Sequence, residues 1–275
     1  MALAGAADGT LLTDGLAGSL FAGGGQVASD RGRHSADGAA GAEELCDAVT
    51  TLARVFYSRT VVKEVPAPSW WRRVVDRTLD IVLATLLLLV LLPLLLLLVV
   101  LVRISTRGPA FFRHVRVGRN GQLFHVLKLR TMVMDADQRL QTLLATSAEA
   151  RAEFQATFKL KDDPRVTGVG RFLRRTSLDE LPQLLNVLWG QMSLVGPRPV
   201  IPEETVRYGP HLPTVLRVRP GVTGVWQVSG RNDIAYDDRV EMDSAYAMHH
   251  GLGTNLAVLL KTVVVVVRPR GNGAY

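Results

Sequence analysis

The clearest feature of the hydrophobic pattern is a long apolar run in the first half of the chain. From Ile81 to Val102 no residue is charged, and only Thr85 and Pro93 interrupt the run of apolar side chains. As one helix this run would be roughly 33 Å long at about 1.5 Å per residue, which is enough to cross the hydrocarbon core of a bilayer. A buried helix of a soluble protein normally keeps a polar face, and this run has none. The pattern therefore predicts a membrane-embedded helix.

Basic residues flank the apolar run on both sides. They are Arg72, Arg73 and Arg77 before it, and Arg103, Arg107, Arg113, Arg116 and Arg119 after it. A straight span would place one of these clusters on the side of the membrane where Lys and Arg are usually scarce. A helix broken at Pro93 would enter and leave through one leaflet and keep both clusters at the anionic cytoplasmic surface. We favour this re-entrant hairpin, with a kinked span as the alternative, since membrane helices tolerate proline.

The chain divides into three regions by composition. Residues 1–68 are rich in Gly, Ala, Ser and Asp and lack the basic start and apolar core of a secretory signal, so we expect a flexible, mostly disordered tail. Residues 69–107 form the membrane-associated region. Residues 108–275 form a folded domain, which we expect on the cytoplasmic face of the membrane.

Within the folded domain the patterns predict a mixed α/β class that is mostly helical. Alternating segments between residues 111 and 126, around Asn120-Gly121, indicate a β-hairpin. Residues 136–160 have a helical pattern. The apolar segment 256–267 is too short for a helical span, so it belongs in the core or, as an interfacial helix, at the membrane surface.

Charge narrows the class of partner. The 275 residues carry 32 Lys and Arg against 25 Asp and Glu, a net charge of +7, which favours nucleic acid, acidic lipid or a phosphorylated substrate. Nucleic acid is excluded as a partner because the charge brackets an apolar hairpin and no groove-reading motif is present. The single cysteine, Cys46, excludes an internal disulfide framework. The sequence has neither a G-x-G-x-x-G motif after a strand nor a Walker A loop. It therefore does not indicate a dinucleotide or ATP site.

The segment from Thr176 to Gln183 is the main candidate for chemistry. One interpretation is a capping box, with Ser177 as the N-cap and Glu180 reaching back to it. The other is a phosphate site, because a helix start amid the guanidinium groups of Arg171, Arg174 and Arg175 would bind an anion. The adjacent carboxylates of Asp179 and Glu180 can hold a divalent metal, and a carboxylate can attack phosphorus. Together with the membrane segment, this suggests phosphoryl-group transfer at a lipid surface.

Weaker signals surround this segment. Gly196-Pro197-Arg198-Pro199 presents one arginine between two prolines, which restrict its backbone. Lys128 and Arg130 lie on the same side of the chain if it is extended. Arg231 and Asp243 are further candidates. The D-x-D spacing of Asp135 and Asp137, which many glycosyltransferases use, arises too often by chance to carry weight.

Taken together, these motifs resemble the bacterial sugar transferase family, the monotopic polyprenyl-phosphate phosphoglycosyl transferases. The match covers about residue 72 to the C-terminus. Its motifs are the basic stretch and Asp80 before the apolar hairpin, Phe111-Phe112-Arg113, Lys128 to Met132, Asp163 to Thr167, Gly170 to Gln183, Asn186 to Leu188, Met192 to Pro199, Arg219 to Gly224 and Gly230 to Asn232. The Trp226–Gly230 run and the Gly273-Ala274-Tyr275 ending are most similar to the undecaprenyl-phosphate galactose phosphotransferase branch.

The resemblance implies transfer of a sugar 1-phosphate, with galactose or glucose as the sugar, from a UDP-sugar to undecaprenyl phosphate, with release of UMP. This would start exopolysaccharide, O-antigen or capsule assembly. It further implies that Asp179 is the nucleophile, that Glu180 assists as a metal or proton partner, and that Mg²⁺ is the cofactor. Lys128 and Arg174 would hold phosphate, and Pro197-Arg198-Pro199 would face the nucleotide.

We extend the phosphate and nucleotide-sugar site to Arg130, Arg171, Arg175 and Arg231, and the metal ligands Asp179 and Glu180 to Asp243. Membrane lipids are further partners. The oligomeric state stays open, with a homodimer as one option. A non-catalytic membrane scaffold of a polysaccharide-assembly complex is the alternative function.

Three features depart from the family pattern. Leu92-Pro93 replaces the usual Ser-Pro at the hairpin, so a hydroxyl that would satisfy freed carbonyls is missing. Asn255 replaces a usual Asp; if that Asp helps to hold the metal, Asn255 supplies only a neutral oxygen. Members of the galactose branch often carry additional N-terminal spans, whereas this sequence has a polar tail.

Overall fold

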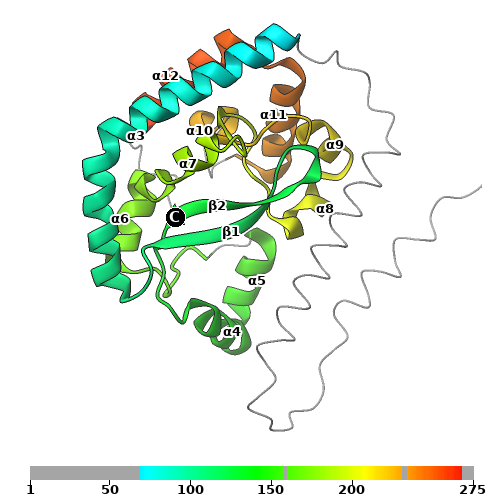
Figure 1. Ribbon diagram of the computed structural model, residues 1–275. Helices are drawn as coiled ribbons and strands as arrows, with labels where there is room; N and C mark the ends of the chain where they lie inside the picture. Colours follow the sequence, from blue (N-terminus) through cyan, green and yellow to red (C-terminus); the bar gives the residue numbers. More distant parts are fainter. Residues whose placement is uncertain (1–68, 158–159, 231–233, 268–275) are drawn as a thin grey trace, which may run out of the picture. The chain divides into compact units, whose positions relative to one another are not determined.

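The computed structural model describes residues 69–157, 160–230 and 234–267 (Figure 1). The predicted tail, residues 1–68, lies outside this part of the chain. In order, the elements are α3 (Trp70–Thr106), β1 (Phe111–Val117), η1 (Arg119–Gly121), β2 (Leu123–Leu129), α4 (Ala136–Thr146), α5 (Ala148–Thr157), α6 (Gly168–Thr176), η2 (Leu178–Glu180), α7 (Gln183–Leu188), β3 (Ser193–Val195), η3 (Pro202–Glu204), α8 (Thr205–Tyr208), η4 (Gly209–His211), α9 (Leu212–Val215), β4 (Gly221–Thr223), α10 (Val225–Ser229), α11 (Tyr236–His249) and α12 (Leu252–Val267). Helices with two small sheets confirm the mixed α/β, mostly helical class.

Helix α3 contains the predicted membrane segment. It is a 37-residue helix with Pro93 inside, and Figure 1 shows that its ribbon changes direction along its length. Proline removes a backbone hydrogen bond and clashes with the preceding turn, which is a recognised cause of such bends. Many aliphatic side chains of α3 face outward; Val90, for example, is 67% exposed. Among the described residues α3 alone has the length and composition to cross a membrane. Because so much exposed apolar surface is unfavourable in water, α3 indicates membrane association.

Both halves of α3 nevertheless pack against one folded body. Near its start, Arg77 donates from Nη1 to the carbonyl oxygen of Val187 in α7 at 2.6 Å. In its second half, Leu98 and Val102 are buried in a cluster with Leu173 of α6. The two ends of the apolar helix are therefore held by neighbouring parts of the same domain.

The buried carboxylate of Asp80 also fixes α3 to this body. Its Oδ1 accepts hydrogen bonds from the hydroxyl of Ser193 at 3.0 Å and from the backbone N–H of Leu194 at 2.9 Å. These two donors belong to β3, so the carboxylate connects the membrane helix to the sheet. A buried charge needs such partners, because an unpaired one would be costly.

The predicted hairpin is present as the antiparallel pair β1–β2. Its register places Phe112 opposite Lys128 and Arg116 opposite Phe124. The turn between the strands uses the left-handed region at Asn120 (φ 59°) and Gly121 (φ 75°), residue types that adopt it readily. Near the open end of the hairpin, Lys128 of β2 reaches Glu180 of η2.

The second sheet is a short parallel pair, β3 with β4. Ser193 pairs with Gly221 and Val195 with Thr223. The hydrophobic core beside it joins buried residues of α3, β2, α7, β3, α11 and α12, among them Ala84, Val126, Val187, Leu194 and Val258. Directly after β3 the chain continues into the segment Gly196-Pro197-Arg198-Pro199, so this core positions the rigid arginine loop.

Candidate functional site

The acidic pair lies on a tight turn between two helices. Helix α6 ends at Thr176, and Ser177 adopts the left-handed conformation (φ 58°, ψ 18°), after which Leu178–Glu180 form a single 3₁₀ turn. Ser177 makes no side-chain capping bond. The capping-box interpretation is therefore wrong: Ser177 closes α6 instead of starting a long helix. The expected anion site at a helix start is likewise replaced by a turn that presents two carboxylates.

Glu180 is held by a cation from the hairpin. Nζ of Lys128 lies 2.7 Å from Oε1 of Glu180, and both side chains are partly exposed. Partial burial raises the pKa of Glu180, but the charge and hydrogen bond of Lys128, with help from Arg198 and Gln183, bring the pKa below its ordinary value. Glu180 is therefore an ionised carboxylate, and Lys128 reaches the acidic pair as predicted.

Asp179 is the more buried of the two carboxylates. Its side chain is only 8% exposed. Burial raises its pKa to about 6; Lys128 and Arg174 oppose this rise, and the negative charge of Glu180 adds to it. A desolvated carboxylate close to two cations is ionised near neutral pH and is weakly solvated, which suits a nucleophile.

Arg174 flanks Asp179 from the last turn of α6. Its Nε donates to Oγ1 of Thr131 at 3.0 Å. Burial lowers the pKa of Arg174, while the nearby Asp179 and Asp163 carboxylates raise it; the net shift is downward and leaves the guanidinium charged at neutral pH. The hydrogen bond fixes one edge of the guanidinium and leaves other N–H donors for a phosphate oxygen.

The second predicted arginine, Arg198, lies close to the acidic pair because its loop is held by backbone bonds. The N–H of Gly221 donates to the carbonyl oxygen of Pro197 at 2.8 Å. Nη1 of Arg116 donates to the carbonyl oxygen of Pro199 at 3.2 Å. The guanidinium of Arg198 lies 5.9 Å from the ring centre of Trp226 and is close enough to Glu180 to lower its pKa. The rigid loop thus brings a third cation to the acidic pair.

Asp243, predicted as a metal ligand, belongs to a different network. Its Oδ2 accepts hydrogen bonds from the hydroxyl of Tyr208 at 3.2 Å and from Nε1 of Trp226 at 3.3 Å. Burial raises its pKa to about 7, while these bonds and the backbone N–H of Arg198 lower it. In the described part of the chain no three His, Cys, Asp or Glu side chains form a group able to hold a metal ion. The structure thus does not gather Asp243 with Asp179 and Glu180, and Asp243 instead supports the Arg198 loop.

The other predicted phosphate ligands lie apart from the acidic pair. Arg130 donates from Nε to the carbonyl oxygen of Pro109 at 2.9 Å and lies over the ring of Phe112. Arg171 and Arg175 are exposed on the surface of α6. Arg231 lies outside the described residues. Lys128, Arg174 and Arg198 are therefore the predicted cations that the structure brings to Asp179 and Glu180.

Asn255 stands where the family that this sequence resembles usually has Asp. In the structure it belongs to a hydrogen-bond network. The Tyr246 hydroxyl lies 2.7 Å from Oδ1 of Asn255 and 3.1 Å from the carbonyl oxygen of Val195. Asn255 therefore joins α12 to α11 and to the end of β3. A neutral amide oxygen is able to accept this hydrogen bond.

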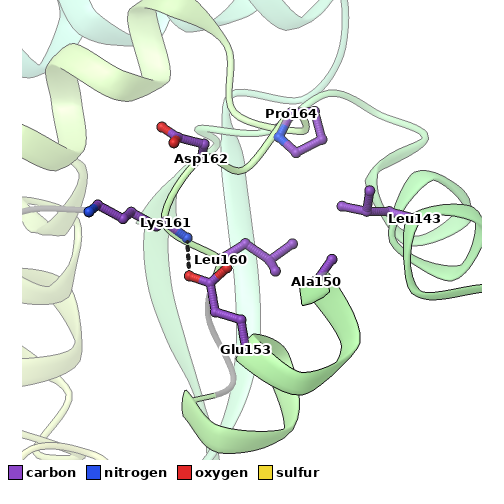
Figure 2. A pocket seen from close by; sticks show the side chains of 7 residues that line it. All are labelled: Leu143, Ala150, Glu153, Leu160, Lys161, Asp162 and Pro164. Atoms are coloured by element: carbon purple, nitrogen blue, oxygen red, sulfur yellow. Dashed lines mark hydrogen bonds between the residues drawn. The ribbon is translucent and has the colours of Figure 1, made fainter. Parts of the chain in front are cut away.

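A separate surface pocket lies between α5 and the segment before α6. Figure 2 shows its lining, which includes Leu143, Leu160 and Glu153, with Oε1 of Glu153 accepting the backbone N–H of Lys161 at 2.7 Å. This pocket contains none of the predicted site residues.

Two residues of β1 that were not among the predicted site residues also lie near this site. His114 and Arg116 lie on the same face of the hairpin as Lys128. Strand alternation in the predicted hairpin is the signal that would have found them, because residues 112, 114 and 116 share a face.

A membrane-associated helix, a carboxylate pair and three converging cations are features suited to group transfer from phosphorylated substrates at a membrane. The comparison with known sequences agrees: the sequence model described as "Bacterial sugar transferase" matches residues 71–269, and the chain belongs to this family. The resemblance in the sequence motifs is thereby confirmed.

Relatives with more specific names support the same assignment. The chain is 51% identical over 203 residues to the undecaprenyl-phosphate galactose phosphotransferase of Salmonella typhimurium, a match over 74% of this chain and 42% of that protein. It is 47% identical to the exopolysaccharide production protein ExoY of Sinorhizobium fredii, over 72% of this chain and 88% of that protein. It is 38% identical to the UDP-glucose:undecaprenyl-phosphate glucose-1-phosphate transferase of Escherichia coli, over 70% of this chain and 40% of that protein. The chain thus spans less than half the length of two of these relatives.

Proposed function

We propose that the protein transfers a sugar 1-phosphate from a UDP-sugar to undecaprenyl phosphate and releases UMP, as the first step of surface-polysaccharide assembly. The observation that carries this proposal is Asp179, a buried carboxylate next to Glu180 and close to the cations Lys128 and Arg174. Two of the relatives have names that contain undecaprenyl phosphate together with galactose or glucose. These names support either hexose as the sugar.

The reaction would proceed in two displacements at one phosphorus atom. An oxygen of the Asp179 carboxylate attacks the phosphorus that bears the sugar, and the bond from this phosphorus to the bridging oxygen breaks. UMP leaves with the bonding electron pair, and a phosphosugar–aspartyl ester remains. A phosphate oxygen of undecaprenyl phosphate then attacks the same phosphorus and frees the carboxylate. Covalent catalysis of this kind lets one site serve a soluble donor and a membrane acceptor in turn.

The three cations would stabilise the negative charge of the reacting groups. Arg174 retains N–H donors on the side of its guanidinium that is not bonded to Thr131. Lys128 holds Glu180 ionised and keeps it beside Asp179. Arg198 is restricted by its rigid loop, so its charge is already in place before a phosphate binds. Positioned charges of this kind supply much of the catalysis of phosphoryl transfer.

The donor set also fits Mg²⁺. Adjacent carboxylates are hard oxygen ligands, and Mg²⁺ typically binds one or two protein carboxylates together with substrate phosphates. Asp179 and Glu180 would be these ligands. When bound, the ion would neutralise charge on the diphosphate oxygens.

The arrangement of α3 supports a monotopic protein whose catalytic domain lies on the cytoplasmic face. Arg77 near the start of α3 and Val102 near its end both contact the same domain. A straight span would carry the far end of α3 away from that domain, whereas a re-entrant bend near Pro93 returns it. Basic residues at both ends of the apolar run are then all on the side where Lys and Arg accumulate.

The nucleophile assignment is tested by Asp179→Asn. Removal of a covalent nucleophile should lower UMP release from UDP-galactose or UDP-glucose by about 1,000-fold or more. The variant should unfold at the same or a higher temperature, because burial penalises the charged form of Asp179 and asparagine carries no charge. Mass spectrometry of the wild-type protein after exposure to each UDP-sugar should show an added hexose phosphate that Asp179→Asn lacks.

The exposed Asp135→Asn is the matched control, since Asp135 pairs with Arg139 one turn further along α4. It should retain normal turnover. Full turnover by Asp179→Asn, or an adduct of unchanged yield on that variant, would disprove the assignment.

A further inference from the structure

One face of β1 presents an aromatic ring, an imidazole and a guanidinium in sequence. Phe112, His114 and Arg116 alternate along the strand and lie on the side of the hairpin that carries Lys128. The rings of Phe112 and His114 are 5.9 Å apart, and Nη2 of Arg116 lies 3.0 Å from Nδ1 of His114. His114 is thus fixed from both sides by its neighbours on the strand.

Arg116 is a buried cation whose bonds go to neutral acceptors. Arg116 is 8% exposed, and its hydrogen-bond partners are the carbonyl oxygen of Pro199 and the ring of His114. Across the described chain, no carboxylate lies within ion-pair distance of Arg116. Burial and the neighbouring Arg198 lower its pKa to about 10, against the opposing charges of Glu204, Glu180 and Glu203. Buried charges are normally paired directly, and Arg116 has no direct ion pair, so a bound anion would stabilise it.

The contact with Arg116 determines which nitrogen of His114 carries the proton. A guanidinium has only donors, so Nδ1 of His114 must accept the hydrogen bond. The neutral ring then has its proton on Nε2. Burial and the charges of Arg116, Lys128 and Arg198 lower the pKa of His114 to about 4, so the ring stays neutral at cellular pH. Nε2–H is therefore a fixed hydrogen-bond donor, without a partner among the described residues.

This donor belongs to the same electrostatic environment as the acidic pair. Lys128 and Arg198, which both act on His114, are also the two cations that lower the pKa of Glu180. Arg116 in addition supports the loop of Arg198 through the carbonyl oxygen of Pro199. Lys128 stands diagonally across the hairpin from His114 on the same face, and its Nζ lies 2.7 Å from Oε1 of Glu180. His114 is therefore on the hairpin face that adjoins the acidic pair, and an anionic oxygen bound at this face would be near both the ring and the cations.

We propose that His114 is a substrate-binding residue that donates a hydrogen bond from Nε2 to a phosphate oxygen of the nucleoside-diphosphate donor. Arg116 is its positioning residue, because it orients the imidazole and supports the Arg198 loop. This inference rests on the proposed function. It adds the face of β1 that carries His114 to the binding site for the nucleoside-diphosphate sugar. A phosphate oxygen of the lipid acceptor has the same chemistry, and the experiment below distinguishes the two sources.

Two substitutions of His114 distinguish the roles of its two ring nitrogens. His114→Asn places an amide oxygen near the position of Nδ1, which keeps the acceptor for Arg116 and removes the distal donor. His114→Gln places an amide nitrogen near the position of Nε2 and keeps the donor. His125→Asn is the matched control, since His125 lies exposed on the opposite face of the same hairpin.

The experiment is calorimetric titration of UDP into the full-length chain in lipid nanodiscs. A hydrogen bond to a charged group is worth about 10- to 100-fold in affinity, so His114→Asn should weaken UDP binding by about that factor. His114→Gln should stay within about threefold of wild type, and His125→Asn should be unchanged. Thermal unfolding of all variants should match wild type, which excludes misfolding as the cause of a lost affinity.

The steady-state constants then identify the source of the phosphate. We expect His114→Asn to raise KM for the UDP-sugar and to leave KM for undecaprenyl phosphate unchanged. Wild-type affinity for UDP in His114→Asn would overturn the inference and leave the proposed function intact, as would an effect confined to KM for undecaprenyl phosphate. A wild-type chain that binds no UDP would instead contradict the proposed function itself.

Discussion

The ionisation of Asp179 depends on its balance between burial and the charge of Lys128. Burial raises the pKa of this carboxyl to about 6, and Lys128 is the strongest influence that lowers it. Because the attacking group is the carboxylate, UMP release by the wild type should increase as pH rises through about 6. In Lys128→Met the lowering charge is lost, so the pKa of Asp179 rises and the acid limb of the pH–rate profile moves to higher pH. The single-turnover rate at saturating donor, measured between about pH 5 and 9, checks this.

Lys128→Arg retains a positive charge and is the control for this prediction. Its acid limb should stay near that of the wild type, even if its rate is lower, because a guanidinium has a different geometry from an ammonium group. An acid limb at the same pH in the Lys128→Met variant and in the wild type would show that Lys128 does not control the ionisation of Asp179.

At the residue scale, the acidic pair was predictable from sequence, whereas the position of its partners was not. Asp179 and Glu180 stand in a dense motif, and Lys128 and Arg198 belong to recognisable motifs of their own. Arg130 and Asp243 carry the same chemical groups, yet the fold directs them to a backbone carbonyl and to a buried tyrosine–tryptophan pair. Which charged side chains meet depends on contacts between segments distant in sequence, and local spacing does not report these.

At the scale of elements, the apolar periodicity correctly predicted the long helix and the β-hairpin. It did not predict how the chain behaves at Ser147 and Ser177, where helices begin or end. The single helix expected over residues 136–160 is divided into α4 and α5, because Ser147 caps the second helix: its Oγ accepts the N–H of Ala150 at 3.1 Å. Ser177 closes α6 instead of capping the next helix. A serine stabilises a helix start in one case and lies at a helix end in the other, and only the backbone conformation distinguishes them.

The packing of α6 against the end of the hairpin gives a prediction at the same scale. A Cβ on Gly170 would lie 2.0 Å from the carbonyl oxygen of Thr131, which is backbone and therefore cannot rotate away. Gly170→Ala should push α6 outward, cost about 1–3 kcal/mol of unfolding free energy and reduce UMP release. Activity should fall because Arg174, bonded to Thr131, and Asp179 lie at the displaced end of α6.

Gly168→Ala is a closely matched control, because a Cβ at Gly168, in the same helix, would meet nothing within 4 Å. It should leave both activity and stability near wild type or slightly raise stability, since alanine favours helix more than glycine does. Denaturant unfolding and UMP release measure the two effects. Equal behaviour of the two alanine variants would contradict the close contact between α6 and Thr131.

At the scale of the whole molecule, the apolar helix and the catalytic domain are not separate modules. The domain holds α3 through the Arg77–Val187 bond, through Asp80 and β3, and through the cluster around Leu98 and Leu173. Asp179, whose phosphosugar adduct the lipid phosphate would attack, is therefore carried by a body attached to the membrane helix along much of its length. This coupling restricts where the two ends of α3 can lie relative to the bilayer.

The membrane topology follows from that restriction and is testable with single cysteines. In a Cys46→Ser background, Ser69→Cys and Arg107→Cys place thiols at the two ends of α3, and Leu89→Cys places one in the apolar run, where Leu89 is 64% exposed. A membrane-impermeant maleimide should label both ends in inside-out vesicles and neither end in intact spheroplasts, while Leu89→Cys stays unlabelled in both. The reason is that both ends of α3 contact one domain, which cannot lie on both sides of a membrane. Labelling of one end from each side would require a helix that crosses the bilayer, and the contacts of Arg77 and Val102 with the same domain could then not coexist.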